Sequence, residues 1–140
     1  MTSPLLDPPF SLPKHTKVLV VLDVVESVRL MEQDEDDFVR RWHQFVHYAE
    51  QQVLPLHHGR IVKSLGDGLM LEFADTHGCV KAAFALQDHT QQGNSGYPEA
   101  RRMHLRIGAH VAEFFADAHD IYGTDVNLTA RIATLAGPGE

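Results

Sequence analysis

The sequence has 140 residues, of which 44% are hydrophobic and 22% are charged, and its formal net charge is −7. This length and composition predict one globular domain with a buried core. The acidic balance excludes a general nucleic-acid binder, whose surface would be basic, but it is compatible with an anionic small ligand held through metal ions.

Compartment signals are weak in this sequence. Residues 1–15 lack a basic start and are interrupted by prolines, so we expect an extended leader rather than a signal peptide. No apolar run reaches the length of a transmembrane helix. Cys79 is the single cysteine and is expected to be a buried, inert thiol. These features predict a cytoplasmic protein with no membrane segment in this chain.

The first part of the domain is predicted to be a strand followed by a long helix. Residues 17–23 are the predicted strand, and residues 18–22 form a continuous apolar run before Asp23, as in a central strand that is buried on both faces. The turn after Asp23 is expected to open a helix. Residues 34–54 repeat apolar side chains at helical spacing and begin with an acidic run that suits the positive end of a helix dipole. Pro55 and Gly59 are expected to end this helix.

A β-hairpin is predicted over residues 61–73. Two apolar runs flank Gly66, Asp67 and Gly68, and Asp-Gly between hydrophobic runs is typical of a tight turn that needs positive φ. The hairpin would hold Asp67 at its tip.

The remaining elements are predicted to be a helix, two strands and a last helix. The first of these helices is expected to run from a cap at Asp75 or Thr76 to about Gln91. Residues 103–109 alternate as in a half-buried strand, and the chain is then expected to continue to residue 115, turn at 116–120 and enter a helix near Thr124. The side chains expected to mark the face of the helix before this strand are Val80, Ala83, Phe84 and Gln87.

The predicted order is therefore strand, helix, hairpin, helix, strand, strand, helix. This order favours an α+β fold: a ferredoxin-like (palm-like), mostly antiparallel sheet with helices packed on one face. Residues 16–140 would form this domain.

Two carboxylates stand at the ends of neighbouring predicted strands. Asp23 follows the first strand, and Asp67 lies at the hairpin tip. Because Mg²⁺ prefers one or two carboxylates plus phosphate oxygens, the pair suggests a divalent-cation site. The alternative is that each aspartate is an ordinary cap or turn residue.

Three further polar residues have a functional and a structural interpretation. Lys63 shares a strand face with Ile61 and Leu65, which is costly for an unpaired ammonium unless the side chain reaches solvent at the edge. Asn127 and Arg131 are four residues apart and would share one helix face. That face is either functional or an ordinary solvated surface.

Three motifs together resemble the class III adenylate/guanylate cyclase catalytic domain. They are Asp23 after an apolar strand, the run Lys63-Ser-Leu-Gly-Asp67-Gly, and the run Asp120-Ile-Tyr-Gly-x-x-Val-Asn127-x-x-x-Arg131. The similarity extends from about residue 17 to residue 140. Since domains of this family continue into further strands, the resemblance implies a domain whose last strands are missing from this chain.

The resemblance implies that ATP is converted to 3′,5′-cyclic AMP and pyrophosphate. Asp23 and Asp67, assisted by the backbone carbonyl of Val24, would hold two Mg²⁺ or Mn²⁺ ions in a two-metal mechanism. Asn127 would orient the ribose, and Arg131 would meet the charge that develops on the α-phosphoryl group.

The resemblance also implies a base-reading pair and a dimer. Lys63 and Asp120 would read adenine, because a carboxylate accepts from its amino group and an ammonium donates to its ring nitrogen. Guanine reverses both features, so an adenylate cyclase is expected rather than a guanylate cyclase. In the family each active site takes residues from two subunits, which implies a two-fold homodimer with shared active sites.

The turn after Asp23 departs from the family pattern, which has Gly where Glu26 stands and Thr where Val28 stands. Because family turns cradle phosphate there, Glu26 would repel the nucleotide unless its side chain points away.

One alternative function is a non-catalytic, cyclase-like regulatory module that binds nucleotide or dimerises. Another is an unrelated metal-dependent nucleotidyl-transfer domain, which would explain Asp23 and Asp67 but not the other motif residues.

Overall fold

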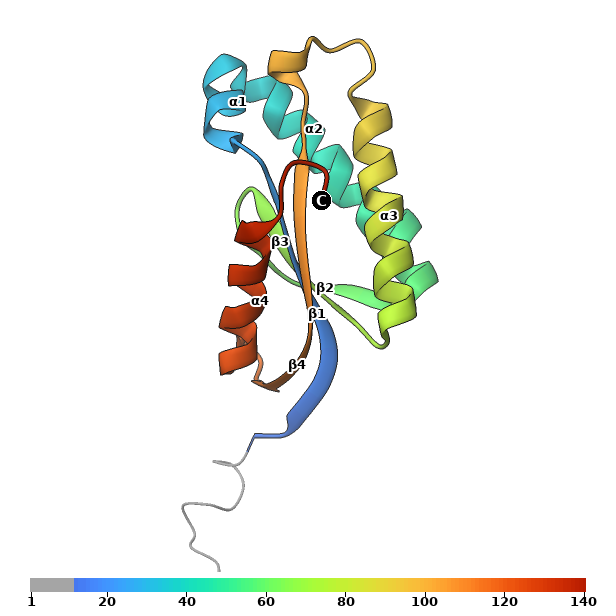
Figure 1. The fold of residues 1–140 in the computed structure, drawn as a ribbon, viewed down its shortest axis with the longest axis vertical. Coiled ribbons are helices and arrows are strands. Elements are labelled where there is room, and N and C mark those ends of the chain that lie inside the picture. Colours follow the sequence, from blue (N-terminus) through green and yellow to red (C-terminus); the bar gives the residue numbers. More distant parts are fainter. Residues whose placement is uncertain (1–11) are drawn as a thin grey trace, which may run out of the picture.

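The computed structural model describes residues 12–140, which form a five-stranded antiparallel sheet with helices packed against it (Figure 1). The strand order is β2-β3-β1-β4-β5, and every neighbouring pair is antiparallel. The strands are β1 (Lys14–Val24), β2 (Gly59–Ser64), β3 (Gly68–Phe73), β4 (Leu105–Ala116) and β5 (Ile121–Tyr122). The α-helices are α1 (Ser27–Gln33), α2 (Glu35–Tyr48), α3 (Thr76–Gly93) and α4 (Thr124–Leu135). The predicted α+β class with a mostly antiparallel sheet is confirmed.

β1 is the central strand, and it is buried on both faces, as its apolar run predicted. On one face, Val18 and Val20 belong to a core that includes Phe38 of α2 and several residues of α3. On the other face, Leu19 belongs to a second core with Val126 of α4. A strand that is apolar on both sides needs cover on both sides. The prediction that all helices pack on one face is therefore wrong for α4.

Two helices, α1 and α2, follow β1, and the second is the predicted long helix. The Asp34 carboxylate caps α2 by accepting a hydrogen bond from the backbone N–H of Asp37 at 3.1 Å. The chain continues from α2 through a π-helical turn over Ala49–Val53 and a 3₁₀ turn over Leu54–His57. The predicted helical span of residues 34–54 is confirmed.

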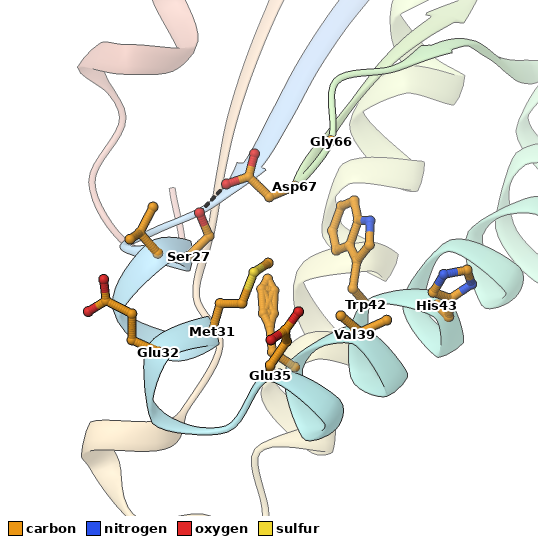
Figure 2. A pocket seen from close by; sticks show the side chains of 11 residues that line it. Ser27, Met31, Glu32, Glu35, Val39, Trp42, His43, Gly66 and Asp67 are labelled. Atoms are coloured by element: carbon orange, nitrogen blue, oxygen red, sulfur yellow. Dashed lines mark hydrogen bonds between the residues drawn. The ribbon is translucent and has the colours of Figure 1, made fainter.

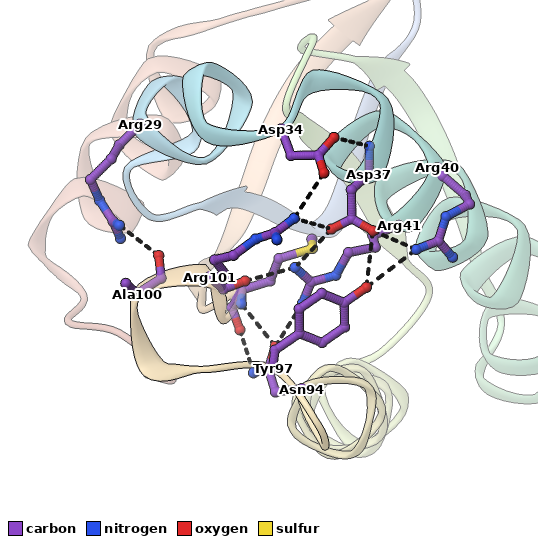
Figure 3. A network of polar contacts seen from close by, with 10 residues as sticks. Arg29, Asp34, Asp37, Arg40, Arg41, Asn94, Tyr97, Ala100 and Arg101 are labelled. Atoms are coloured by element: carbon purple, nitrogen blue, oxygen red, sulfur yellow. Dashed lines mark hydrogen bonds and ion pairs between the residues drawn. The ribbon is translucent and has the colours of Figure 1, made fainter.

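The acidic start of α2 also anchors the loop that precedes β4 (Figure 3). Asp37 accepts a hydrogen bond from the Tyr97 hydroxyl at 3.0 Å, and Arg101 lies 3.0 Å from Asp34 and 3.4 Å from Asp37. The Arg41 guanidinium stacks 3.8 Å from the centroid of the Tyr97 ring. The acidic run therefore has a tertiary role in addition to its role at the helix N-terminus.

α3 presents a different face to the core from the predicted one. Val80 and Phe84 are 51% and 68% exposed, whereas Cys79 and Ala82 are buried. The helix approaches its neighbours so closely that a Cβ on Gly78 would lie 2.5 Å from a backbone oxygen. Small side chains therefore lie near this close approach, while Leu86 is the large α3 side chain that enters the core further along the helix. The buried position predicted for Cys79 is confirmed.

Strand boundaries shift slightly from the predicted ones. β1 begins at Lys14, so residues 14 and 15 of the expected leader belong to the sheet, while residues 1–11 lie outside the described residues. The strand predicted to reach residue 115 is the single strand β4, and the two-residue strand β5 follows the expected turn.

α4 packs directly on β4. A Cβ on Gly108 would lie 2.4 Å from the backbone nitrogen of Ala133, so only glycine allows this contact. After α4 the chain returns along β4, where the Ile107 N–H donates to the Glu140 carbonyl oxygen at 2.8 Å. Within residues 12–140, no helix has both the length and the apolar character needed to cross a membrane.

Candidate active site

The β2–β3 hairpin carries Asp67 next to the end of β1. The predicted hairpin is confirmed, but the positive φ that the Asp-Gly pattern predicted lies at Gly66 (+86°) and at neither Asp67 nor Gly68. Gly68 pairs with Asp23 across the β1–β3 ladder. A Cβ on Gly68 would lie 2.6 Å from the Leu22 carbonyl oxygen, so glycine is needed for the two strands to approach this closely.

Asp23 and Asp67 consequently leave adjoining strands at the same end of the sheet. The Val24 N–H donates to the backbone carbonyl oxygen of Asp67 at 3.3 Å, which links the two segments directly. The two half-buried carboxylates have different partners: Asp23 is paired with Arg106, and Asp67 accepts a hydrogen bond from the Ser27 hydroxyl (Figure 2). The backbone therefore brings the aspartates together, while each carboxylate has a partner of its own.

Arg106 is a site residue that the sequence analysis missed. It faces Asp23 across the β1–β4 ladder, and its Nε and Nη2 atoms lie 3.0 and 2.9 Å from the two carboxylate oxygens. This hydrogen-bonded carboxylate raises the pKa of the Arg106 guanidinium. The alternating pattern of residues 103–109 indicated a strand, but only the strand register identifies the partner of Arg106.

The turn after Asp23 holds Glu26 in the left-handed conformation at φ 52° and ψ 41°, which is strained for a residue other than glycine. The Glu26 carboxylate accepts from Arg29 at 3.3 Å, and Arg29 also donates to the Ala100 carbonyl oxygen at 2.7 Å. The acidic side chain that departs from the family pattern is therefore partly neutralised by a neighbouring cation.

Lys63 and Asp120 form a direct ion pair. The Lys63 ammonium lies 3.0 and 3.1 Å from the two Asp120 oxygens. Lys63 is on β2 and Asp120 precedes β5, which are the outermost strands, so a curled sheet is needed to bring them together. The bond from Lys63 and the backbone N–H of Ile121 lower the pKa of the Asp120 carboxyl. The strand lysine is thus paired rather than isolated at the edge.

Asn127 and Arg131 lie one turn apart on α4, and both side chains are exposed. The start of α4 is held against β4, because the Asp125 carboxylate accepts from the Glu113 backbone N–H at 2.9 Å. Within residues 12–140, neither Asn127 nor Arg131 is a hydrogen-bond partner of the two strand-end aspartates. The α4 pair and the strand-end aspartates are therefore not joined by hydrogen bonds within one chain.

The oxygen donors at the end of β1 suit a hard divalent cation. Asp23 and Asp67 could offer carboxylate oxygens, and the adjacent Val24 carbonyl could offer a neutral oxygen. The described part of the chain has no group of three or more His, Cys, Asp or Glu side chains that could hold a metal ion. Because Mg²⁺ is commonly held by one or two carboxylates together with substrate phosphates, these residues fit an ion that a nucleotide helps to bind.

Comparison with curated proteins connects this site to the cyclases. The chain is 32% identical over 133 residues to "Putative adenylate cyclase 3" of Rhizobium meliloti (strain 1021). The match covers 92% of this chain but 22% of the relative, so the chain spans only a part of that longer protein. No protein-family model matches the chain.

Solved structures share the fold over nearly the whole chain. The crystal structure of an adenylate/guanylate cyclase/hydrolase from Silicibacter pomeroyi has a TM-score of 0.79 and 26% identity, and the match covers 91% of this chain and 73% of that one. The adenylyl cyclase CyaB from P. aeruginosa has a TM-score of 0.73 and covers 92% of this chain and 77% of its own, although 21% identity shows the fold alone. The sequence relative and the shared fold each cover more than nine tenths of this chain, and the chain belongs to the class III adenylate/guanylate cyclase catalytic-domain family.

Proposed function

We propose that the chain is the catalytic domain of an adenylate cyclase, which converts ATP to 3′,5′-cyclic AMP and pyrophosphate. The observation that carries this proposal is the β1–β3 register, in which Gly68 pairs with Asp23 and leaves Asp67 beside it. In the reaction the ribose 3′-oxygen would form a bond to the α-phosphorus, the bond to the β-phosphate would break, and pyrophosphate would leave with the 3′-hydroxyl proton released.

Asp23, Asp67 and the Val24 carbonyl would hold two Mg²⁺ or Mn²⁺ ions. When bound, such ions lower the pKa of the attacking hydroxyl and neutralise the leaving pyrophosphate. Arg106 competes for the Asp23 carboxylate, since both of its oxygens accept from the guanidinium. Each Asp23 oxygen keeps a further lone pair for a cation, but the positive charge of Arg106 opposes ion binding there.

Lys63 and Asp120 would select adenine. The Asp120 carboxylate would accept from the adenine amino group, and the Lys63 ammonium would donate to the ring nitrogen. Their mutual pairing at 3.0 Å supports this role, because it keeps a donor and an acceptor side by side at the spacing of one base edge. Guanine would meet a donor with a donor and an acceptor with an acceptor, which leaves buried polar groups unpaired.

Asn127 and Arg131 would act on a nucleotide held by a second subunit. Asn127 would orient the ribose, and Arg131 would stabilise the charge that develops on the α-phosphoryl group, as arginine fingers do for about 10³ to 10⁵ in rate. Their exposure on α4 supports action across an interface. A two-fold homodimer would then form two equivalent shared sites.

Mixing two inactive variants tests the shared site. Asp67→Ala and Arg131→Ala are each expected to abolish cyclic AMP formation from ATP and Mn²⁺, whereas a mixture that forms heterodimers should regain up to about a quarter of the wild-type activity. Asp36→Ala removes an exposed acidic side chain of α2 outside the site and serves as the control. Heterodimers without activity would contradict the shared site, and a faster reaction with GTP than with ATP would contradict the base assignment.

The alternative is a cyclase-like module that binds nucleotide without turning it over. The strained Glu26 in the phosphate-side turn is the observation that favours it. Binding of ATP to the wild-type chain with no cyclic AMP formed, under conditions where the chain dimerises, would support the module over the enzyme.

A further inference from the structure

A pocket of about 650 Å³ lies between α1, α2 and the tip of the β2–β3 hairpin (Figure 2). This volume is typical of small-molecule sites. Val28 and Met31 of α1 and Val39 and Trp42 of α2 line it, together with the Phe38 ring. Val28, Met31 and Val39 are 69%, 38% and 41% exposed, so their apolar surface is open to an incoming group. A concavity with such walls favours the apolar part of a ligand.

The charged groups of the pocket have one predominant sign. Glu32, Glu35 and Asp67 line it, and His43 is the lining residue that can become cationic. Asp67 is engaged by Ser27, whereas neither Glu32 nor Glu35 forms an ion pair within residues 12–140 (Figure 2). Two free carboxylates beside an apolar wall disfavour an anion and attract a cation.

The aromatic wall points to the same kind of ligand. Trp42 is half-buried and lines the pocket with Met31, and an indole is the side chain that attracts a cation most strongly through its ring face. Met31 is unbranched and adapts to apolar groups of different shapes. The pocket therefore combines an adaptable apolar surface, an aromatic side chain and negative charge.

We propose that this pocket binds a small amphipathic cation, namely an organic amine with an aromatic or branched apolar body. The apolar body would lie against Met31, Val39 and Trp42, and the ammonium would lie near Glu32 and Glu35. The proposed cyclase reaction uses none of these five side chains, but the pocket adjoins the proposed metal site, because Asp67 also lines it. The test therefore uses neither nucleotide nor metal.

Trp42 is the single tryptophan of the chain, so the intrinsic tryptophan fluorescence reports on the surroundings of this one side chain. Because Trp42 also lines a smaller neighbouring pocket, the Glu35 variant described below assigns the signal to the proposed one. Three probes of matched size should be titrated against the wild-type chain: 4-phenylbutylamine, 4-phenylbutan-1-ol and 4-phenylbutanoate. The amine should change the Trp42 emission saturably and bind about three- to tenfold more tightly than the alcohol, as expected for attraction to two partly exposed carboxylates. The carboxylate probe should bind more weakly than the alcohol, and added salt should reduce the advantage of the amine.

Two variants with equal charge changes separate the pocket from the general acidity of the chain. Glu35→Gln should reduce the affinity for the amine toward that for the alcohol. Asp36→Asn, at the next residue of α2 but outside the pocket lining, should leave the amine affinity within about twofold of wild type. Equal affinities for all three probes, no saturable change with the amine, or equal effects of the two variants would each overturn the proposal.

Discussion

Replacing Gly68 with alanine tests the close approach of β3 to β1 on which the candidate site depends. The new Cβ would lie 2.6 Å from the Leu22 carbonyl oxygen, and the strands must separate by about 0.8 Å to reach an ordinary contact of 3.4 Å. Neither atom belongs to a flexible side chain, so the backbone itself must move. We expect Gly68→Ala to lower the free energy of unfolding by about 1–3 kcal/mol, the usual cost of overpacking.

The same separation would move Asp67 away from Asp23, because Gly68 is the residue paired with Asp23. The affinity for Mn²⁺, measured by calorimetry in the presence of a non-reactive ATP analogue, is expected to fall at least about tenfold, or about 1.4 kcal/mol. Urea unfolding would provide the stability of each variant.

Gly66→Ala is the matched control for this experiment. Gly66 has φ +86° with no atom within 4 Å of a built Cβ, so an alanine there strains only its own backbone, by about 1–2 kcal/mol. The two variants should therefore lose similar stability but differ in Mn²⁺ affinity, which Gly66→Ala should retain within about threefold. Unchanged Mn²⁺ affinity in folded Gly68→Ala would refute the argument that this strand approach builds the site.

Three further outcomes follow from individual residues. Glu26→Gly should raise the free energy of unfolding by up to about 1 kcal/mol, because the substitution relieves the left-handed strain and removes only an exposed ion pair with Arg29. Urea unfolding measures this free energy, and a variant less stable than wild type would contradict the prediction. Arg106→Gln should raise the affinity for Mn²⁺ in the absence of nucleotide by about three- to tenfold, because Asp23 loses its competing cation. Calorimetry measures this affinity, and weaker Mn²⁺ binding would show that Arg106 instead favours ion binding. Burial raises the pKa of the Cys79 thiol to about 11, so at pH 8 only about one thiol in 10³ is ionised. Cys79 should therefore react slowly with a disulfide reagent in the folded chain and rapidly in denaturant, and equal rates would contradict its burial.

Features with local causes were predictable from the sequence. The helix at residues 34–54 begins at an acidic cap because the first free N–H groups of a helix donate to such a side chain, and the Asp34 carboxylate accepts one of these bonds. The hairpin follows from a Gly-containing turn between two apolar runs, although the positive φ falls on Gly66 and not on the Asp-Gly pair. The spacing of the three motifs is also read from the sequence without any structure. The observed fold is the one expected for the family that this spacing indicated.

Features that depend on partners distant in the chain were not predictable. The helical period of α3 allowed either of two adjacent faces to be buried, and the close approach at Gly78 decided for the smaller side chains Cys79 and Ala82. The two-sided burial of β1 was read correctly, but the covering of its second face by α4 came from the fit of Ala133 over Gly108.

The candidate site divides in the same way. The sequence by itself determined that Asp23 would end a buried strand and that Asp67 would stand at a hairpin tip, because both follow from apolar runs and turn chemistry within a few residues. Only the tertiary structure decided that Arg106 occupies the Asp23 carboxylate and that Lys63 meets Asp120 directly. Strand register and sheet curl set these pairings, and both arise from packing across the whole domain rather than from the order of neighbouring residues.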